Sequence, residues 1–229
     1  MLNKDIHKIF LIKILKAIYS DPDLRNSLGF KGGTAAFLFY NLPRLSVDLD
    51  FNLLDLKKKE LVFEKLKELL TEFGNLVDAT NKRYTLFFLL SYKKGERKVK
   101  IEISKRPSKA EFKLKNYLGI PVLLMAKQDM AAGKLSALIT RKKFASRDLF
   151  DLWFYLKNDW QINEEVLKEN SKVNLRQALK KAIEKVKKVK KRHLLQGLGK
   201  LLDEKQKFWV KENLPKDLLF YLNLYLKNL

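Results

Sequence analysis

The stretch Ser46-Val47-Asp48-Leu49-Asp50-Phe51 alternates apolar and polar residues, and this pattern predicts a strand over residues 46–52. Successive side chains of a strand point to opposite faces. One face, which can be buried, carries Val47, Leu49 and Phe51. The other face carries Asp48 and Asp50, about 6.5–7 Å apart along the strand.

Two carboxylates this close repel each other unless a cation lies near both. A pair of divalent ions about 3.5–4 Å apart would fill that role. Because the ligands are hard oxygens, Mg²⁺ or Mn²⁺ is favoured over zinc. The alternative is a strand edge with two solvated aspartates. A later strand, 97–104, also alternates, and we expect it to bring Glu102 beside Asp48 and Asp50 as a third metal ligand. The alternative for Glu102 is a surface carboxylate.

A glycine pair precedes the aspartates. Residues 28–31 form a short extended run that enters Gly32-Gly33, and residues 34–41 are expected to be helical. Glycines at such a turn let backbone N–H groups approach a phosphate, and the N-terminus of the helix favours its negative charge. The alternative is a tight turn without a ligand.

The rest of the chain predicts an α+β fold with a small mixed sheet. Helices are expected over 4–20, 56–73, from Pro121 to 139, and over 146–156, and a hairpin over 83–92 and 97–104. Every segment after about 160 has helical periodicity. We therefore expect an α/β domain over residues 1–120 and a helical domain over 121–229, with a soft boundary between 105 and 160.

Composition narrows the classes of function. The chain has 229 residues, 48 Lys and Arg against 26 Asp and Glu, and a net charge of +22, which favours a polyanionic partner. It has no cysteine and two histidines, His7 and His193, so thiolate chemistry and His-rich zinc sites are excluded. No run of eighteen uncharged apolar residues occurs and the first ten residues lack a signal peptide's features, so we expect a cytoplasmic protein without a membrane partner.

Two basic runs, 93–115 and 180–192, predict a footprint on a phosphate backbone, with RNA as the partner. The alternative is a solvated helix face. Six aromatic residues are candidates for stacking on bases, although most aromatics at these spacings belong to a core: Tyr84, Tyr92, Tyr117, Phe144, Trp153 and Trp160.

Four blocks of sequence together resemble a known family. They read F-K-G-G-T-A at 30–35, R-L-S-V-D-L-D-F at 44–51, A-G-K-L-S-A-L-I-T-R at 132–141 and R-D-L-F-D-L at 147–152. The first two resemble the polymerase-β-type nucleotidyltransferases. The whole set is similar to one branch of that superfamily, the AbiEii-type toxins of abortive-infection toxin–antitoxin systems.

The resemblance implies a polymerase-β-like nucleotidyltransferase domain that transfers NMP from an NTP to an RNA acceptor, tRNA in particular, and a cognate antitoxin as partner. It implies catalytic roles for Lys134 and for one of Asp148 and Asp151, between which spacing does not decide. The full set of candidate catalytic residues is Asp48, Asp50, Glu102, Lys134, Asp148 and Asp151. The candidate metal ligands are Asp48, Asp50 and Glu102, and the candidate nucleotide-binding residues are Lys31, Gly32, Gly33, Thr34, Arg44 and Ser46.

The blocks at 132–141 and 147–152 can also be interpreted from helix geometry and charge. Lys127, Lys134 and Arg141 recur every seven residues, which places them on one stripe of a helix. A lysine there can hold a triphosphate as a point charge. Equally, Arg141 can form structural ion pairs with the aspartates of the following helix. Two other functions remain open: a non-catalytic basic RNA-binding protein that retains the fold, and nucleotidyl transfer to a protein or a small molecule. The NTP, the acceptor and the oligomeric state are not determined by the sequence.

Overall fold

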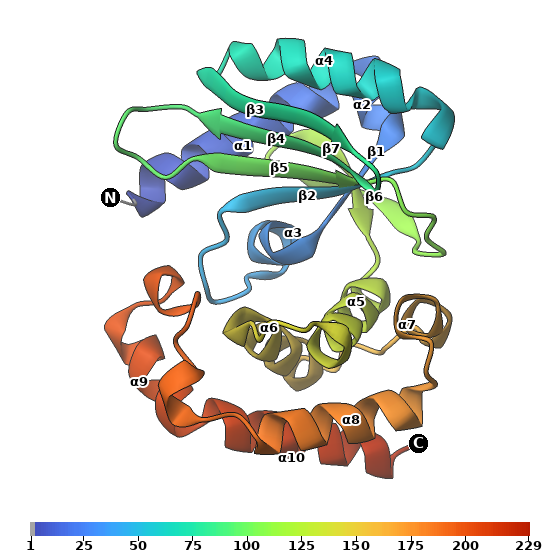
Figure 1. Cartoon of the computed structure of the whole chain (residues 1–229), viewed down its shortest axis with the longest axis vertical. Helices are drawn as coiled ribbons and strands as arrows, with labels where there is room; N and C mark the ends of the chain where they lie inside the picture. Colours follow the sequence, from blue (N-terminus) through green and yellow to red (C-terminus); the bar gives the residue numbers. More distant parts are fainter. Residues whose placement is uncertain (1–2) are drawn as a thin grey trace. The chain divides into compact units, whose positions relative to one another are not determined.

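The computed structural model describes residues 3–229, which form two compact units (Figure 1). One unit comprises the residues up to Pro107 together with Phe112–Met125, and the other comprises Ser108–Glu111 together with Ala126–Leu229. The chain therefore passes between the units three times. The boundary expected after residue 120 lies five residues earlier than the last of these crossings.

The first unit is an α+β fold built on a seven-stranded mixed sheet, which confirms the expected fold class. The strand order is β3-β4-β5-β2-β1-β7-β6, and the strands are β1 (Leu28–Lys31), β2 (Asp48–Leu53), β3 (Asn75–Lys82), β4 (Thr85–Ser91), β5 (Val99–Ser104), β6 (Phe112–Tyr117) and β7 (Ile120–Met125). The pairs β2–β5 and β1–β7 are parallel, and the other pairs are antiparallel. The predicted hairpin is confirmed as β4 and β5.

Helices cover both faces of this sheet. Helices α1 (Lys4–Ser20), α2 (Pro22–Ser27) and α4 (Lys59–Thr71) lie on one face, and α3 (Gly32–Tyr40) lies on the other (Figure 1). A short 3-10 turn, Leu56–Lys58, precedes α4. The core lies between the first face and its helices, and the apolar sides of β2, β4 and β5 are fully buried there, as the alternation of apolar residues predicts.

The sequence-based prediction of a helix from Pro121 is wrong for its first residues, because 120–125 form β7. The run Ile120-Pro121-Val122-Leu123-Leu124-Met125 is apolar enough to suit either a strand or a buried helix. Pro121 is the second residue of the strand, and the helix α5 begins only at Lys127. Strands β3 and β6 were not predicted, because they are largely exposed at the two edges of the sheet and carry polar residues.

The second unit is helical, as expected for the C-terminal half. Its helices are α5 (Lys127–Thr140), α6 (Ser146–Lys157), α7 (Glu164–Ser171), α8 (Leu175–Lys187), α9 (Glu204–Glu212) and α10 (Leu214–Lys227), with 3-10 turns at Lys191–His193 and Gly199–Leu201. Helix α8 packs along α10, and α5 packs on α6, α7 and α8. In the basic helix α8, Ala182, Ile183 and Val186 are buried.

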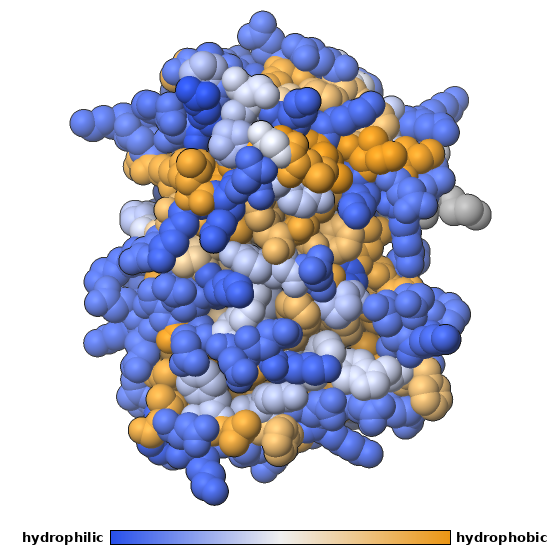
Figure 2. Space-filling model, turned by 180° about the vertical axis from the view of Figure 1, so that it is seen from behind, coloured by the Kyte–Doolittle hydropathy of each residue, from blue (hydrophilic) through white to orange (hydrophobic). Residues whose placement is uncertain are grey.

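Hydrophilic residues cover most of the face that Figure 2 shows. This distribution agrees with the excess of Lys and Arg in the sequence. Among residues 3–229, no helix combines the length and the apolar character that crossing a bilayer requires.

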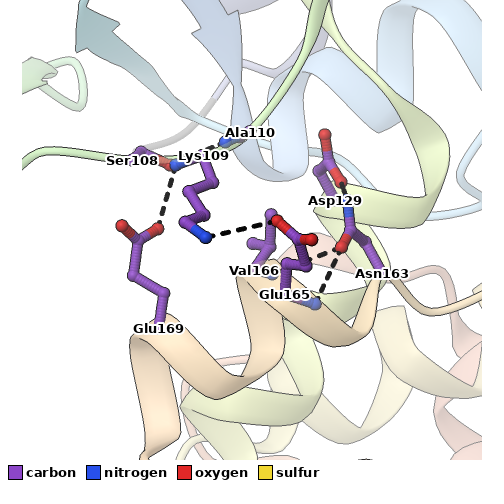
Figure 3. A network of polar contacts seen from close by, with 8 residues as sticks. All are labelled: Ser108, Lys109, Ala110, Asp129, Asn163, Glu165, Val166 and Glu169. Atoms are coloured by element: carbon purple, nitrogen blue, oxygen red, sulfur yellow. Dashed lines mark hydrogen bonds and ion pairs between the residues drawn. The ribbon is translucent and has the colours of Figure 1, made fainter.

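The segment Ser108–Glu111 is fixed to the helical unit by a polar network (Figure 3). Lys109 donates from its backbone N–H to Glu169 Oε2 (3.0 Å) and pairs through Nζ with Glu165 Oε2 (3.3 Å). The carboxylate of Asp129 is buried, with 1% of its surface exposed. It accepts from the backbone N–H of Glu111 and from Asn163 Nδ2, both at 2.7 Å. Asn163 in turn caps α7.

We expect Asp129→Ala to destabilise the helical unit by about 2–4 kcal/mol, because the part-buried donors of Glu111 and Asn163 lose their acceptor, each loss costing about 1–3 kcal/mol. The measurement is urea unfolding followed by tryptophan fluorescence. Glu165→Ala is the control, since it removes only an exposed ion pair, worth at most about 1 kcal/mol. Equal destabilisation by the two variants would contradict the role given to the buried carboxylate.

Candidate active site

Two rows of charged side chains cross the middle of the sheet. Lys31 of β1 lies opposite Asp50 of β2, which lies opposite Glu102 of β5. In the next row along, Asp48 lies opposite Lys100. The structure therefore confirms that a neighbouring strand places Glu102 beside the two aspartates. The strand begins at Asp48 rather than at Ser46, so Ser46 lies in the loop that enters it.

Lys100 is a member of this cluster that the sequence analysis did not identify. Its Nζ lies 2.9 Å from Glu102 Oε2 and 3.6 Å from Asp48 Oδ2. Burial lowers the pKa of Lys100, but the charges of Asp48 and Glu102 outweigh that effect and hold the pKa above its usual value. Lys100 is therefore a cation shared by two of the three carboxylates.

Asp50 has a different environment from Asp48. Burial, and then the neighbouring charge of Asp48, raise the pKa of Asp50 above its usual value, although the Lys31 ammonium opposes the shift. Burial lowers the pKa of Lys31, whose Nζ donates to Asn52 Oδ1. A net cost of ionising Asp50 therefore remains, and a further cation close to both aspartates would reduce it.

The turn after β1 is built around the lack of side chains at its two glycines. Gly32 has φ +82°, and a Cβ atom there would lie 2.7 Å from Asp50 Oδ2. A Cβ atom at Gly33 would lie 2.5 Å from Arg44 Nη2 and 3.0 Å from Ser46 Oγ. The predicted nucleotide-binding residues are thus brought together: the start of α3 lies against Asp50, Arg44 and Ser46.

The N-terminus of α3 has no side-chain cap, since its N-cap residue Lys31 makes no capping hydrogen bond. The hydroxyl of Thr34 donates instead to the backbone carbonyl of Asp48, which ties α3 to β2. Arg44 is buried and donates from Nη1 to the carbonyl of Leu45 (3.0 Å). Uncapped N–H groups beside a buried guanidinium form a suitable environment for an anion.

We expect Gly32→Ala to reduce nucleotide binding and turnover by more than about tenfold, because the new methyl group would displace the carboxylate of Asp50. Gly119→Ala is a matched control. Gly119 also has φ +82°, but nothing lies within 4 Å of its Cβ position. Both variants pay the cost of a left-handed conformation, about 1–2 kcal/mol, and Gly32→Ala must also displace Asp50. Tm should therefore fall in both and further in Gly32→Ala, while the activity of the folded protein falls only in Gly32→Ala. Equal activity in the two variants would contradict this role of the turn.

His7 positions the entrance to β2 and was not assigned a role from the sequence. Its ring is completely buried, with Nε2 3.0 Å from the carbonyl of Val47 and Nδ1 2.9 Å from Tyr92 Oη. Since a carbonyl only accepts, Nε2 carries the proton and Nδ1 accepts from the tyrosine. Burial lowers the pKa of His7, so the neutral ring is favoured. The signal in the sequence was a histidine on the otherwise apolar side of an N-terminal helix.

The other predicted residues form a second cluster inside the helical unit. Lys134 of α5 lies 3.0 Å from Asp148 Oδ1 and 2.8 Å from Asp151 Oδ2, both on α6. Arg141 Nη1 lies 3.1 Å from Asp148 Oδ2. Asp148 and Asp151 are buried, with 2% and 0% of their surfaces exposed. Both aspartates thus contact Lys134, and the ion pairing by Arg141 that the sequence allowed is present.

Metal coordination can be judged from the donors present. Among residues 3–229, no group of three or more His, Cys, Asp or Glu side chains is arranged to hold a metal ion. Mg²⁺ in phosphoryl-transfer sites needs only one or two carboxylates, because substrate phosphates and water supply the remaining ligands. Asp48 and Asp50 provide two carboxylates on one face, and their mutual repulsion is the charge pattern that a dication relieves. The donor set therefore fits Mg²⁺ or Mn²⁺.

Comparison with solved structures shows which proteins share this fold. A structure of a candidate nucleotidyltransferase from H. pylori has a TM-score of 0.63 and 22% identity, and the alignment covers 97% of this chain and 94% of that one. The structure of JHP933 from Helicobacter pylori has a TM-score of 0.63 and 21% identity, with 100% and 94% coverage. At these identities the similarity shows the fold. No curated protein sequence matches the chain.

The family described as "Nucleotidyl transferase AbiEii toxin, Type IV TA system" matches residues 13–213. The match extends well beyond the four motifs and includes most of the helical unit. It covers the glycine turn and the carboxylate strands of the first unit, and the Lys134 cluster of the second. This chain belongs to the AbiEii nucleotidyltransferase toxin family.

Proposed function

We propose that this protein transfers NMP from an NTP to the terminal hydroxyl of an RNA, with tRNA as the acceptor class, and acts as the toxin of a toxin–antitoxin pair with a cognate antitoxin as partner. The observation that carries the proposal is the close approach of the Gly32-Gly33 turn to Asp50, Arg44 and Ser46, beside the carboxylates of β2. Membership of the AbiEii family supports nucleotidyl transfer as the reaction.

In the proposed reaction the acceptor oxygen attacks the α-phosphorus, the bond to the β-phosphate oxygen breaks, and pyrophosphate leaves. Backbone N–H groups of Gly33 and Thr34, with Ser46 Oγ, bind phosphate oxygens at the start of α3. The Arg44 guanidinium adds positive charge behind the turn. These groups are held in place by the sheet before substrate arrives, so their orientation costs little during the reaction.

Asp48 and Asp50 would hold Mg²⁺ or Mn²⁺, which in such a site neutralises triphosphate charge and activates the acceptor oxygen. Glu102 is the third candidate ligand, and Lys100 holds it at 2.9 Å. Lys134 is proposed to provide a positive charge that interacts with the triphosphate. Asp148 and Asp151 are proposed to hold the Lys134 ammonium in position. In that role the aspartates are positioning residues for Lys134.

The test is incubation of the full chain with each α-labelled NTP, Mg²⁺ and total RNA, followed by gel separation of the RNA. Label in a defined RNA band, lost when EDTA replaces Mg²⁺ and when Asp48→Asn replaces the wild type, is the expected result. Label on a protein or small molecule would identify a different acceptor. If no NTP yields labelled product although RNA binds, the protein is a non-catalytic RNA-binding member of the family.

A further inference from the structure

A pocket of about 470 Å³ lies within the helical unit, to which all of its lining residues belong. Its walls come from the end of α5, the loop from Arg141 to Ala145, the end of α8 and the 3-10 turn at Lys191–His193. Its volume is within the range of sites for small ligands, about 300–1,000 Å³. The pocket shares Asp148 with the Lys134 cluster, and its other lining residues have no role in the proposed nucleotidyl transfer.

The pocket is strongly basic. Seven lysine and arginine residues line it: Arg141, Lys142, Lys143, Lys185, Lys188, Lys190 and Arg192. The carboxylate among the lining residues, Asp148, is already paired with Lys134 and Arg141. Among residues 3–229, Lys142, Lys143, Lys188 and Lys190 make no ion pair, and all four are exposed. This excess of charge suits a ligand with more than one phosphate.

One of the lysines has a structural task instead. Lys185 Nζ donates to the carbonyls of Leu138 (3.0 Å) and Ile139 (2.8 Å) at the end of α5. A cation at the C-terminus of a helix satisfies carbonyls that lack a partner in the helix. Lys185 therefore fixes the loop that begins at Arg141 against α8, so the pocket exists before a ligand binds.

Part of the pocket's lining is apolar. It is formed by Ala137, Leu138, Phe144, Ala145 and Val189. Phe144 is half-buried, unlike Trp153 and Trp160, which belong to the core. A purely inorganic anion would gain nothing from these residues, whereas the flat face of a base would stack on an aromatic ring.

We propose that this pocket binds a phosphorylated nucleoside, with the base against Phe144 and the phosphates at Lys142, Lys143, Lys188 and Lys190. The nucleotide can come from an RNA strand or from free NTP. The inference extends the proposed function, and it rests on that function for the choice of RNA as one source. Binding itself requires neither a metal ion nor catalysis.

The test measures binding by fluorescence anisotropy with the full chain in EDTA, using a labelled 12-nucleotide RNA and a labelled ATP. The pocket variant carries K142Q, K143Q, K188Q and K190Q. The matched control carries K168Q, K180Q, K205Q and K216Q, which remove the same charge from exposed helix positions outside the pocket. We expect the pocket variant to bind at least about tenfold more weakly at 150 mM salt, and its salt slope to fall by about 0.7 for each lost RNA contact. Equal weakening by both variants would overturn the proposal.

The role of the base is tested by Phe144→Ala, with Phe144→Leu to preserve packing. Phe144→Ala should weaken nucleotide binding about tenfold or more and leave competition by inorganic tripolyphosphate unchanged. Unchanged nucleotide binding in both variants would overturn the proposal. Competition shows whether the natural ligand is an RNA strand or free NTP. Whichever of unlabelled RNA and unlabelled ATP displaces the labelled probe at the lower concentration is the preferred source of the nucleotide.

The two proposals can fail separately. Asp48→Asn should lose nucleotidyl transfer and retain pocket binding. If the wild type binds nucleotide in the pocket but transfers none, only the proposed function is contradicted. If the wild type transfers nucleotide and the pocket variant binds nucleotide as well as the wild type does, only this inference is contradicted.

Discussion

Asp50→Asn is expected to reduce nucleotidyl transfer by at least about 10²–10³-fold, and at neutral pH to raise Tm rather than lower it. The first effect follows from loss of a carboxylate in the proposed metal site. The second follows from the raised pKa of Asp50: ionisation of this buried group opposes folding, even with Lys31 nearby. The asparagine has nearly the same shape and no charge, so that cost disappears.

The increase in Tm expected for Asp50→Asn depends on pH in a definite direction. A carboxyl whose pKa is raised on folding stabilises the folded state only when it is protonated. This stabilisation begins to be lost as the pH rises through the pKa of the carboxyl in the unfolded chain, about 3.9. The difference in Tm between Asp50→Asn and the wild type should therefore grow as pH rises above about 4 and vanish below it. Melting curves from pH 3 to 8 measure this. Asp78→Asn, on β3 of the same sheet, is the control for loss of a carboxylate charge. Near wild-type transfer by Asp50→Asn would contradict the assignment of the active site.

Lys134→Ala is expected to destabilise the helical unit by about 3–5 kcal/mol. It removes the ammonium that lies 2.8 Å from Asp151 and 3.0 Å from Asp148, and removing one partner of a buried ion pair costs about this much. All three tryptophans, Trp153, Trp160 and Trp209, lie in this unit, so fluorescence during urea unfolding reports on it specifically.

A double-mutant cycle separates stability from chemistry. Lys134→Ala combined with Asp151→Ala should recover part of the lost stability, since the cation and one of its partners are removed together. Transfer should remain low in the double variant if Lys134 contributes charge to the triphosphate. Recovery of transfer together with stability would show that Lys134 acts only in folding.

The alternation at 46–52 was sufficient to predict the strand, its buried face and the pairing of the two aspartates, because a strand's period is set by local geometry. It could not identify Lys100. The contact of Lys100 with Asp48 depends on a parallel register between β2 and β5, strands separated by two other strands in the chain. Register between distant strands is set by the packing of the whole sheet, which one strand's sequence does not contain.

The Lys134 cluster shows a different limit. Spacing placed Lys134 and Arg141 on one stripe of α5 and the two aspartates on one turn of α6, but it did not choose between Asp148 and Asp151. In the structure the i,i+3 relation puts both carboxylates within 3.0 Å of one ammonium. The strand β7 was misread because a continuous apolar run carries no period that separates a buried strand from a helix.

The three crossings between the units have a consequence for synthesis on the ribosome. Strand β7, at the last crossing, pairs with both β1 and β6, so the sheet is incomplete until Met125 has been made. The segment Ser108–Glu111 must wait longer, because its partners on α7 follow more than fifty residues later. A nascent chain that carries Asp48 and Asp50 therefore exposes an unfinished sheet edge until Met125 has emerged, and such edges invite association with other chains. Slow translation after residue 111 should favour aggregation, and neither unit can be produced by a simple cut of the chain.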